Sequence, residues 1–527
     1  MAPFFAFNSN PLSFIAILNF SYFLFAIFSE HHVAETAIFI YKCTLKSHPT
    51  RITRSLFTRY KITKKHKNKI KHFIAGCDKD LLKAFTLKRM IRNITFQRTY
   101  RLMNKNKITL SLAAAVTLGM SANAMAAGFQ LAEYSATGLG RAFAGEAAMA
   151  DNASAQFRNP AMMTYLEGTQ ISIGAIYVDP NIDVEGKVNG VAQTKASDIA
   201  NSAVIPNLYL SHQVNDQWVI GLAFGTNYGM ETELGGDYQA TAFGNQAMVK
   251  TIEINPNLAY KINEQFSVGG GVRYVMGEGH FGAALPKSAG GADLKYMEGD
   301  DTAWGWQLGA AWQINPDHRI GVNYRSAVDL TLEGKASGLA YDKASAMQGK
   351  TPSKDYAGSL DLTLPATAEI ASFHQLTDKV AVHASFNWTD WSSFEKLEAN
   401  IPSVSSKPDL IKEENWEDNY RLAVGTTYQY TSKLALRSGI AYDTSAVSDK
   451  HRTQTIPETD RLWLSIGAGY AWSDNLTLDA GFTYIFAKDA SMSEELDLNG
   501  DKVADSTFKG ETSGNIWLVG VQANYKF

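Results

Sequence analysis

The fold is decided by the stretch "NIWLVGVQANYKF", Asn515 to Phe527, at the carboxyl end of the sequence. Every second residue is apolar or aromatic on one side: Trp517, Val519, Val521, Ala523, Tyr525 and Phe527. The other side mixes apolar residues with glycine, amides and lysine. A period of two indicates a β-strand with two different faces. A continuous apolar face with aromatic ends is typical of a strand that meets lipid.

The same alternation recurs from Thr169 onward in fourteen segments, an even number. Short polar turns, such as Val214 to Gln217 and Ser473 to Asn475, alternate with long connections, such as 229–250 and 389–419. A soluble β-sandwich has no reason to keep all its long loops at one end, whereas an outer-membrane barrel does. We therefore expect residues 169–527 to form an all-β transmembrane barrel of 14 antiparallel strands in the outer membrane of a Gram-negative bacterium.

Charge divides the chain into two unlike parts. Residues 1–126 hold 20 Lys and Arg and 4 Asp and Glu, which leaves 49 − 20 = 29 basic and 52 − 4 = 48 acidic residues, a net charge of −19, for 127–527. The stretch "MNKNKITLSLAAAVTLGMSANAMA", 103–126, has two lysines, a short apolar core and an Ala-Met-Ala end. This pattern predicts a secretory signal peptide.

Residues 1–102 precede that predicted signal peptide and contain both cysteines, Cys43 and Cys77. An apolar stretch at 10–28 followed by the basic run "KITKKHKNKIKH" could be a membrane anchor with a basic flank. A signal peptide is expected at the start of a chain, so we favour the interpretation that 1–102 is an untranslated or non-native extension.

Residues 127–168 lie between the predicted signal peptide and the first predicted strand. They are rich in Ala and Gly, and Asn159 and Pro160 suit the N-cap and first position of a short helix. Fourteen strands enclose more space than their own side chains fill easily. We expect 127–168 to be a small helical hatch that plugs the lumen, with a capped periplasmic helix as the alternative.

The stretch "AGFQLAEYSATGLGRAFAGEAAMADNASAQFRNPA", Ala127 to Ala161, closely resembles the hatch of the FadL family of outer-membrane long-chain fatty acid transporters. The resemblance continues through "NYGMETE" and "IPETDRLWLSIGAGYA" to the last residue. It implies a fourteen-stranded monomeric barrel that takes up hydrophobic compounds passively. Ligand would enter an apolar pocket and leave sideways into the membrane at a kink in the third strand.

The resemblance assigns site residues by position. The hatch residues are Phe129, Asn159, Pro160 and Ala161, and Phe129 reaches toward the pocket. The strand kink falls at Asn227, Tyr228 and Gly229, where a glycine permits a bend, although a plain strand end has the same sequence pattern.

Charged residues complete the expected site. Asp418 and Arg461 match a polar pair that the family keeps inside the barrel near the kink, while Asp198 stands where the family has an Asn. Arg325 and Arg421 alternate inward and are candidate partners for a substrate carboxylate, or for acidic neighbours. The resemblance assigns no residue of this chain to an outer capture site.

Other classes fit less well. A general porin needs a charged, water-filled eyelet, and a TonB-dependent transporter needs about 22 strands. No Ser-His pairing, metal spacing or phosphate loop indicates an enzyme, a metal site or a cofactor. The expected partners are hydrophobic small molecules, outer-membrane lipid and lipopolysaccharide, and no nucleic acid. Long-chain fatty acids are the expected substrate, with aromatic hydrocarbons as the alternative.

Overall fold

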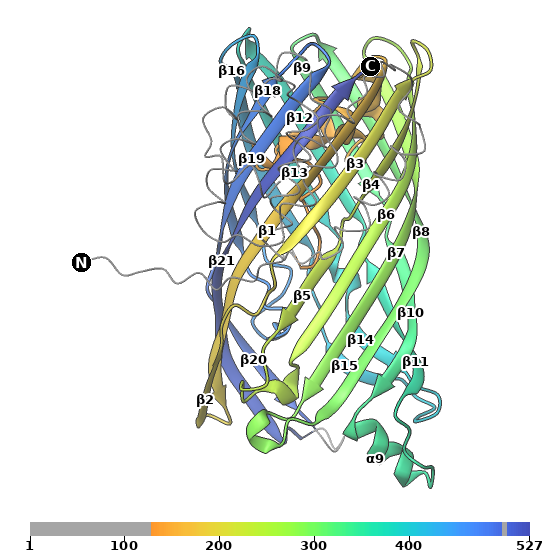
Figure 1. Cartoon of the computed structure of the whole chain (residues 1–527), viewed down its shortest axis with the longest axis vertical. Coiled ribbons are helices and arrows are strands. Elements are labelled where there is room, and N and C mark those ends of the chain that lie inside the picture. Colours follow the sequence, from red (N-terminus) through yellow and green to blue (C-terminus); the bar gives the residue numbers. More distant parts are fainter. Residues whose placement is uncertain (1–127, 498–502) are drawn as a thin grey trace, which may run out of the picture. The chain divides into compact units, whose positions relative to one another are not determined.

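A computed structural model describes residues 128–497 and 503–527. The predictions for residues 1–102 and for the signal peptide at 103–126 lie outside the described residues. The described part is a closed barrel of tilted strands (Figure 1).

Fourteen antiparallel seams close the barrel into a ring, as the sequence predicts. The strands follow one another around it in the order β1 (Thr169–Val188), β3 (Ala203–Gln213), β4 (Trp218–Gly225), β6 (Gln246–Lys261), β7 (Phe266–Ala284), β8 (Asp293–Asn315), β9 (His318–Arg325), β12 (Thr367–Thr377), β13 (Val380–Thr389), β16 (Asn419–Gln429), β17 (Leu434–Asp443), β18 (Arg461–Ala471), β19 (Leu476–Ala487) and β21 (Ser506–Lys526). The last strand pairs with the first, so the ring has no open edge at that seam.

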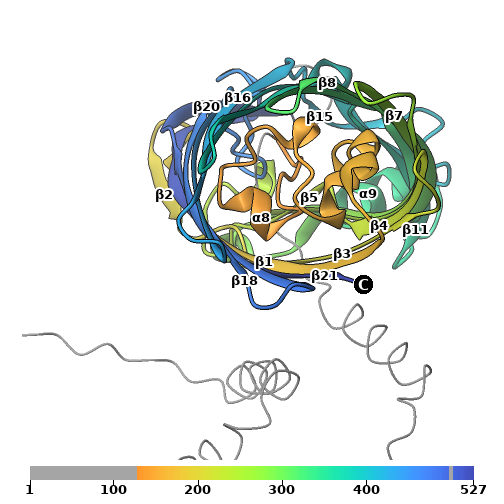
Figure 2. The same cartoon turned by 90° about the horizontal axis from the view of Figure 1, so that it is seen from above.

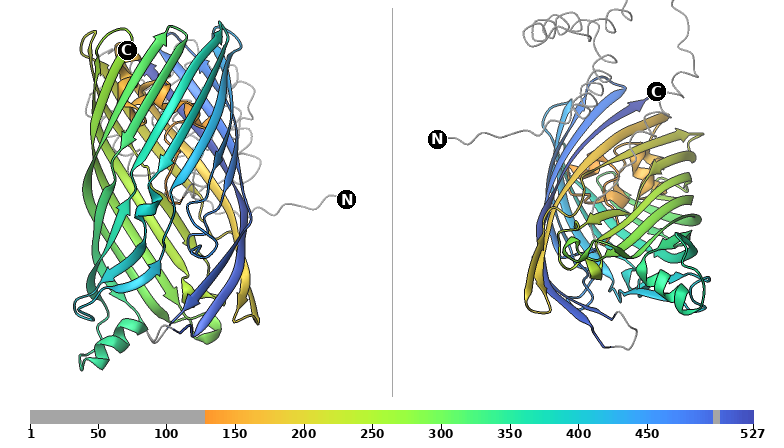
Figure 3. Two further views of the ribbon diagram at one scale, coloured as in Figure 1. Left: turned by 180° about the vertical axis from the view of Figure 1, so that it is seen from behind. Right: turned by 60° about the horizontal axis from the view of Figure 1, so that its bottom comes forward.

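The remaining strands extend this wall at the long-loop end, which Figure 3 shows from two further sides. They are β2 (Ala192–Ala196), β5 (Gly229–Glu233), β10 (Val328–Ser337), β11 (Tyr356–Leu364), β14 (Lys396–Asn400), β15 (Asp409–Glu413) and β20 (Ala490–Leu496). The same end carries α9 (Leu339–Met347) and the short turns η4 (Thr241–Phe243), η5 (Lys287–Ala289) and η6 (Trp391–Ser393).

The two faces of the strands differ as predicted. On β18, Leu464 and Ile466 are 44% and 62% exposed, whereas the intervening Ser465 is 4% exposed. On β21, Val519 and Val521 point outward and Leu518 is fully buried. Among the described residues, this apolar outer face packs against no other part of the chain, which is typical of a face that meets lipid.

The long connections contain more strand than the alternation predicts. The expected connection at 229–250 contains β5 and the first residues of β6, and the expected connection at 389–419 contains β14 and β15. Beyond the apolar band, strand pairing continues with polar side chains, for which hydrophobic alternation gives no signal.

Residues 128–168 lie inside the ring, as the view down the barrel shows (Figure 2). They form α8 (Ala136–Leu139), η1 (Glu146–Ala148), η2 (Ala153–Phe157) and η3 (Pro160–Tyr165), all short. Alanines and glycines let them approach the wall: a Cβ on Gly321 would lie 1.8 Å from the carbonyl oxygen of Ala147. No helix among the described residues is long and apolar enough to cross a membrane.

Candidate functional site

Asn159 fixes the carboxyl end of the inner segment. Its side-chain oxygen accepts a hydrogen bond from the Ala161 N–H at 3.0 Å, which makes it the N-cap of η3 with Pro160 at the first helical position, as predicted. Its amide nitrogen donates to the carbonyl oxygens of Ala147 (2.6 Å) and of Ala310 on β8 (3.0 Å). One side chain therefore joins two turns of the inner segment to the barrel wall.

Arg325 anchors the same end from the wall. Its guanidinium donates to the carbonyl oxygen of Phe157 and forms an ion pair with Glu253 at 2.6 Å. Glu253 also pairs with Arg273 at 3.0 Å, and all three side chains are at most 3% exposed. The partners of Arg325 are therefore the Glu253 carboxylate and the Phe157 carbonyl oxygen. Arg325 does not line the apolar cavity described below.

Phe129 lies at the other end of the inner segment, within an aromatic cluster formed by Phe129, Tyr228, Trp391, Phe394 and Trp416. The Phe129 ring centroid lies 4.6 Å from that of Trp391 and 6.1 Å from that of Tyr228, in edge-to-face contacts. Gly128 has a φ of +70°, and a Cβ there would lie 2.5 Å from the Trp416 indole. The chain can therefore pass beside the indoles only as glycine.

The third barrel strand is interrupted at the predicted kink. β4 ends at Gly225, opposite Glu253, and β5 begins at Gly229, opposite Lys250. Three residues of the third strand thus face two residues of β6, which is the arrangement of a bulge. The backbone at the interruption pairs with the inner segment: Leu131 donates to Asn227 at 2.6 Å, and Gly229 donates to Phe129 at 2.8 Å.

The interruption leaves β3 without a neighbour along part of its length. β3 pairs with β4 only from Leu208 to Gln213, so 203–207 pairs with β1 alone. In the described part of the chain, no ladder joins β5 to β3. The gap ends where Glu233 donates to the carbonyl oxygen of Ile199 at 2.7 Å. Beside Phe129, β3 and β5 are therefore not joined by backbone hydrogen bonds.

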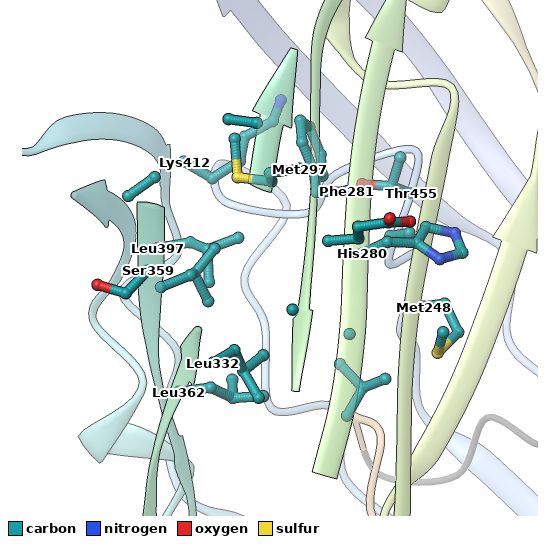
Figure 4. Close-up of a pocket in the computed structure, with 18 of the residues that line it drawn as sticks. Met248, His280, Phe281, Met297, Leu332, Ser359, Leu362, Leu397, Lys412 and Thr455 are labelled. Atoms are coloured by element: carbon teal, nitrogen blue, oxygen red, sulfur yellow. The ribbon is translucent and has the colours of Figure 1, made fainter. Parts of the chain in front are cut away.

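An apolar cavity lies between the Phe129 end of the inner segment and the long loops (Figure 4). About 800 Å³ of space free of protein atoms lies within its outline, and part of this space is open solvent. Its walls include Phe129, Met230, Phe281, Met297, Leu332, Leu362, Leu397 and Ile401. The cavity and the strand interruption thus share Phe129 as a common wall.

Few polar groups reach this cavity. Lys335 pairs with Glu298 at 2.9 Å, and Lys412 pairs with Glu494. Glu414 accepts a hydrogen bond from the Trp416 indole at 2.8 Å, and burial raises the pKa of its carboxyl to about 7. The cations that line the cavity are these two lysines.

A second, more polar cavity lies beside the inner segment and is lined in part by β12, β13 and β16. Arg421 lines it and forms an ion pair with Asp443 at 3.0 Å, while donating to the carbonyl oxygen of Ala142. Arg421, like Arg325, pairs with one carboxylate and donates to one backbone carbonyl oxygen of the inner segment. A role for either arginine toward a substrate carboxylate stays a prediction.

Asp418 and Arg461 do not meet as an ion pair among the described residues. Asp418 accepts from the Trp388 indole at 2.8 Å and is only half-buried. Arg461 is 3% exposed, and its nearest ion-pair partner is Glu458, at 4.0 Å. Asp198 is exposed and its backbone N–H bonds Asp183.

Trp391, Trp416 and Lys412 were not predicted from the sequence. All three come from the connection between β13 and β16, where Trp391 is fully buried and Lys412 lies on β15. The sequence did contain a signal that this connection is partly buried. Exposed loops seldom contain many large aromatic residues, and this connection contains or adjoins Trp388, Trp391 and Trp416.

Comparison with known proteins agrees with this architecture. Residues 117–527 match the family described as outer membrane protein transport protein (OMPP1/FadL/TodX). The chain is 34% identical over 454 residues to the long-chain fatty acid transport protein of Escherichia coli O6:H1, covering 79% of this chain and 98% of that protein. It is 37% identical over 441 residues to the 47 kDa outer membrane protein of Pasteurella multocida, covering 80% and 99%.

Solved structures share the fold. A FadL homologue from Pseudomonas aeruginosa superposes with a TM-score of 0.68 at 23% identity, covering 76% of this chain and 100% of that chain. The Ralstonia pickettii toluene transporter TbuX gives a TM-score of 0.51 at 18% identity, covering 72% and 94%. Since the family match spans most of the chain and the relatives exceed 30% identity, this chain belongs to the FadL family of outer-membrane transport proteins and is a passive transporter, not an enzyme.

Proposed function

We propose that this protein carries long-chain fatty acids into the outer membrane, through the apolar cavity and out sideways through the gap between β3 and β5. The observation that supports this most is the position of Phe129. Its side chain lines the cavity, while its carbonyl oxygen accepts a hydrogen bond from Gly229 at the strand interruption. Displacing the segment around Phe129 from the strand interruption would connect the cavity to the gap between β3 and β5.

The cavity suits an acyl chain energetically. Each buried methylene contributes about 0.8 kcal/mol, so a chain of about eighteen carbons gains on the order of 10 kcal/mol before ordering costs. Sideways release keeps the chain out of water. Lys412 lines the cavity and is our candidate for binding the substrate carboxylate. Its ammonium group could pair with that carboxylate and with Glu494 at the same time.

The relatives support the substrate class. Five of the matched proteins are named for long-chain fatty acid transport, among them those of Escherichia coli O6:H1 and of strain K12. The structural neighbours named for toluene are below 25% identity and speak only for the fold. Aromatic hydrocarbons therefore remain the alternative substrate, without a feature of this cavity that favours them.

The test is uptake of labelled oleate by cells that lack their own outer-membrane fatty acid transporter, with and without this protein. We expect uptake to be restored, and to fall several-fold with Leu332→Asn, which places an amide in the cavity wall. Thr331→Asn is the matched control, because Thr331 is the exposed neighbour on the same strand. Folded barrel in the outer membrane without oleate uptake, but with uptake of labelled toluene, would overturn the fatty acid assignment.

A further inference from the structure

Two histidines far apart in sequence face each other at the short-turn end of the barrel. His318 is the first residue of β9, and His374 lies on β12, directly opposite it in the strand register. The backbone bond from Gln375 to the carbonyl oxygen of Asp317, at 2.8 Å, flanks the pair. A pair placed beside such a bond is of the non-hydrogen-bonded type, in which opposing side chains come closest.

The two imidazoles are close enough to share one ligand. Their Nδ1 atoms lie 3.1 Å apart, and the ring planes are inclined by 61°. Two metal–nitrogen bonds of about 2.0–2.1 Å, at an angle between square and tetrahedral, hold their nitrogens about 2.9–3.4 Å apart. The observed separation falls inside that interval, so small rotations of the rings would bring both nitrogens onto one ion.

The pair points away from the lumen. Its sequence neighbours Arg319 and Phe373 contact each other on the inner face, where Arg319 donates to the carbonyl oxygen of Ala148 at 2.8 Å. Strand alternation therefore places His318 and His374 on the outer face, and both are half-buried. The adjoining turn, 315–317, is exposed, so water can reach the pair and complete a coordination sphere.

We propose that His318 and His374 bind one divalent transition-metal ion of the Zn²⁺, Ni²⁺ or Cu²⁺ type, which neutral imidazole nitrogens favour. Among the described residues no group of three or more metal-binding side chains lies together, so water supplies the other ligands. Such a site is open, holds its ion less tightly than a four-ligand structural zinc site, and would clamp β9 to β12.

The first experiment is calorimetric titration of ZnCl₂ into the folded barrel in detergent, prepared without a histidine tag and stripped with EDTA. We expect one ion per barrel, and at least about tenfold weaker binding in His318→Gln and in His374→Gln. His212→Gln is the matched control, because His212 stands at the same end of the barrel but bonds the Thr169 hydroxyl, at 2.7 Å. Binding that is absent, or unchanged in both variants, overturns the proposal.

The second measurement needs no variant. Electron paramagnetic resonance of one equivalent of Cu²⁺ on the unaltered barrel should show coupling to two imidazole nitrogens. Coupling to one or none overturns the proposal even if a substituted barrel fails to fold. Heat-modifiable migration on a denaturing gel checks folding of each variant.

Discussion

The two ends of the inner segment, 128–168, are held by different forces. The Asn159 end is fixed by directional hydrogen bonds and a buried ion triad that together reach four strands of the wall, β6, β7, β8 and β9. The Phe129 end is held by aromatic contacts and by two backbone bonds at a strand interruption. Aromatic contacts tolerate sliding, whereas a buried charge cannot lose its partner cheaply. Under the proposed lateral release, this difference would make the Asn159 end the anchor and the Phe129 end the releasable end.

The largest effect should come from fixing the releasable end. Gln130 and Tyr228 form an isolated antiparallel bridge flanked by the bonds at Leu131 and Gly229, which is a non-hydrogen-bonded pair with Cα atoms about 4.5 Å apart. That spacing suits a disulfide. In Gln130→Cys/Tyr228→Cys, oleate uptake should fall to background when oxidised and recover with reductant, because residues 103–527 contain no other cysteine. The single variants control for lost side chains, and full uptake by fully oxidised protein would contradict release at this end.

Breaking the anchor should cost stability instead. Arg325→Gln removes a charge that satisfies Glu253 inside the barrel, so we expect the free energy of unfolding to fall by about 3–5 kcal/mol. Urea unfolding of the barrel in lipid vesicles, followed by tryptophan fluorescence, measures it. Lys261→Ala, which breaks an ion pair with the exposed Glu264, should cost less than about 1 kcal/mol. Equal losses in the two variants would remove the distinction between anchor and surface.

Acidity should tighten the releasable end through Glu414. Burial raises the pKa of this carboxyl to about 7, so the folded loop binds a proton more strongly than the unfolded chain does. Stability of the aromatic cluster should therefore decrease as pH rises from about 4.5 to about 7, by up to about 3 kcal/mol, and stay level above. Glu414→Gln should flatten this profile, measured by hydrogen exchange of the Trp416 loop at several pH values. A slope that persists in the variant would assign it to another group.

The smallest effect is expected from the cap. Asn159→Ala removes the N-cap of η3 and two further bonds to carbonyl oxygens, which should cost about 1–2 kcal/mol and loosen the anchor locally. Hydrogen exchange at Ala161 and Met162 should speed up while exchange on β18 stays slow. Asn263→Ala, which removes a cap in an exposed turn, is the control and should leave the inner segment unchanged.

The sequence predicts the strands of the barrel wall better than the contacts of the side chains inside the barrel. Outward and inward residues of β18 and β21 follow a period of two because lipid imposes it on every strand, so the strand number and faces could be derived from the sequence. The N-cap at Asn159 could also be predicted, because it depends only on adjacent residues. Arg325 and Arg421 show the limit: their inward direction was correct, but their partners Glu253 and Asp443 are set by the closed ring.

Long-range placement explains the other omissions. Lys412 lines the cavity from β15, a short strand within a long connection, where hydrophobic alternation gives no signal. His318 and His374 are 56 residues apart and meet only through the register of β9 and β12. A pair of this kind becomes visible only once the strands are aligned.

The length of β8 sets where a ligand first meets the protein. Its 23 residues span about 78 Å at 3.4 Å per residue, or about 60 Å of height at the tilt usual for such barrels. The apolar band of an outer-membrane barrel is only about 25 Å tall. About 35 Å of wall therefore lies beyond the apolar band. If the ligand leaves through the gap as proposed, protein encloses it along this height, and it first meets lipid at the level of the gap.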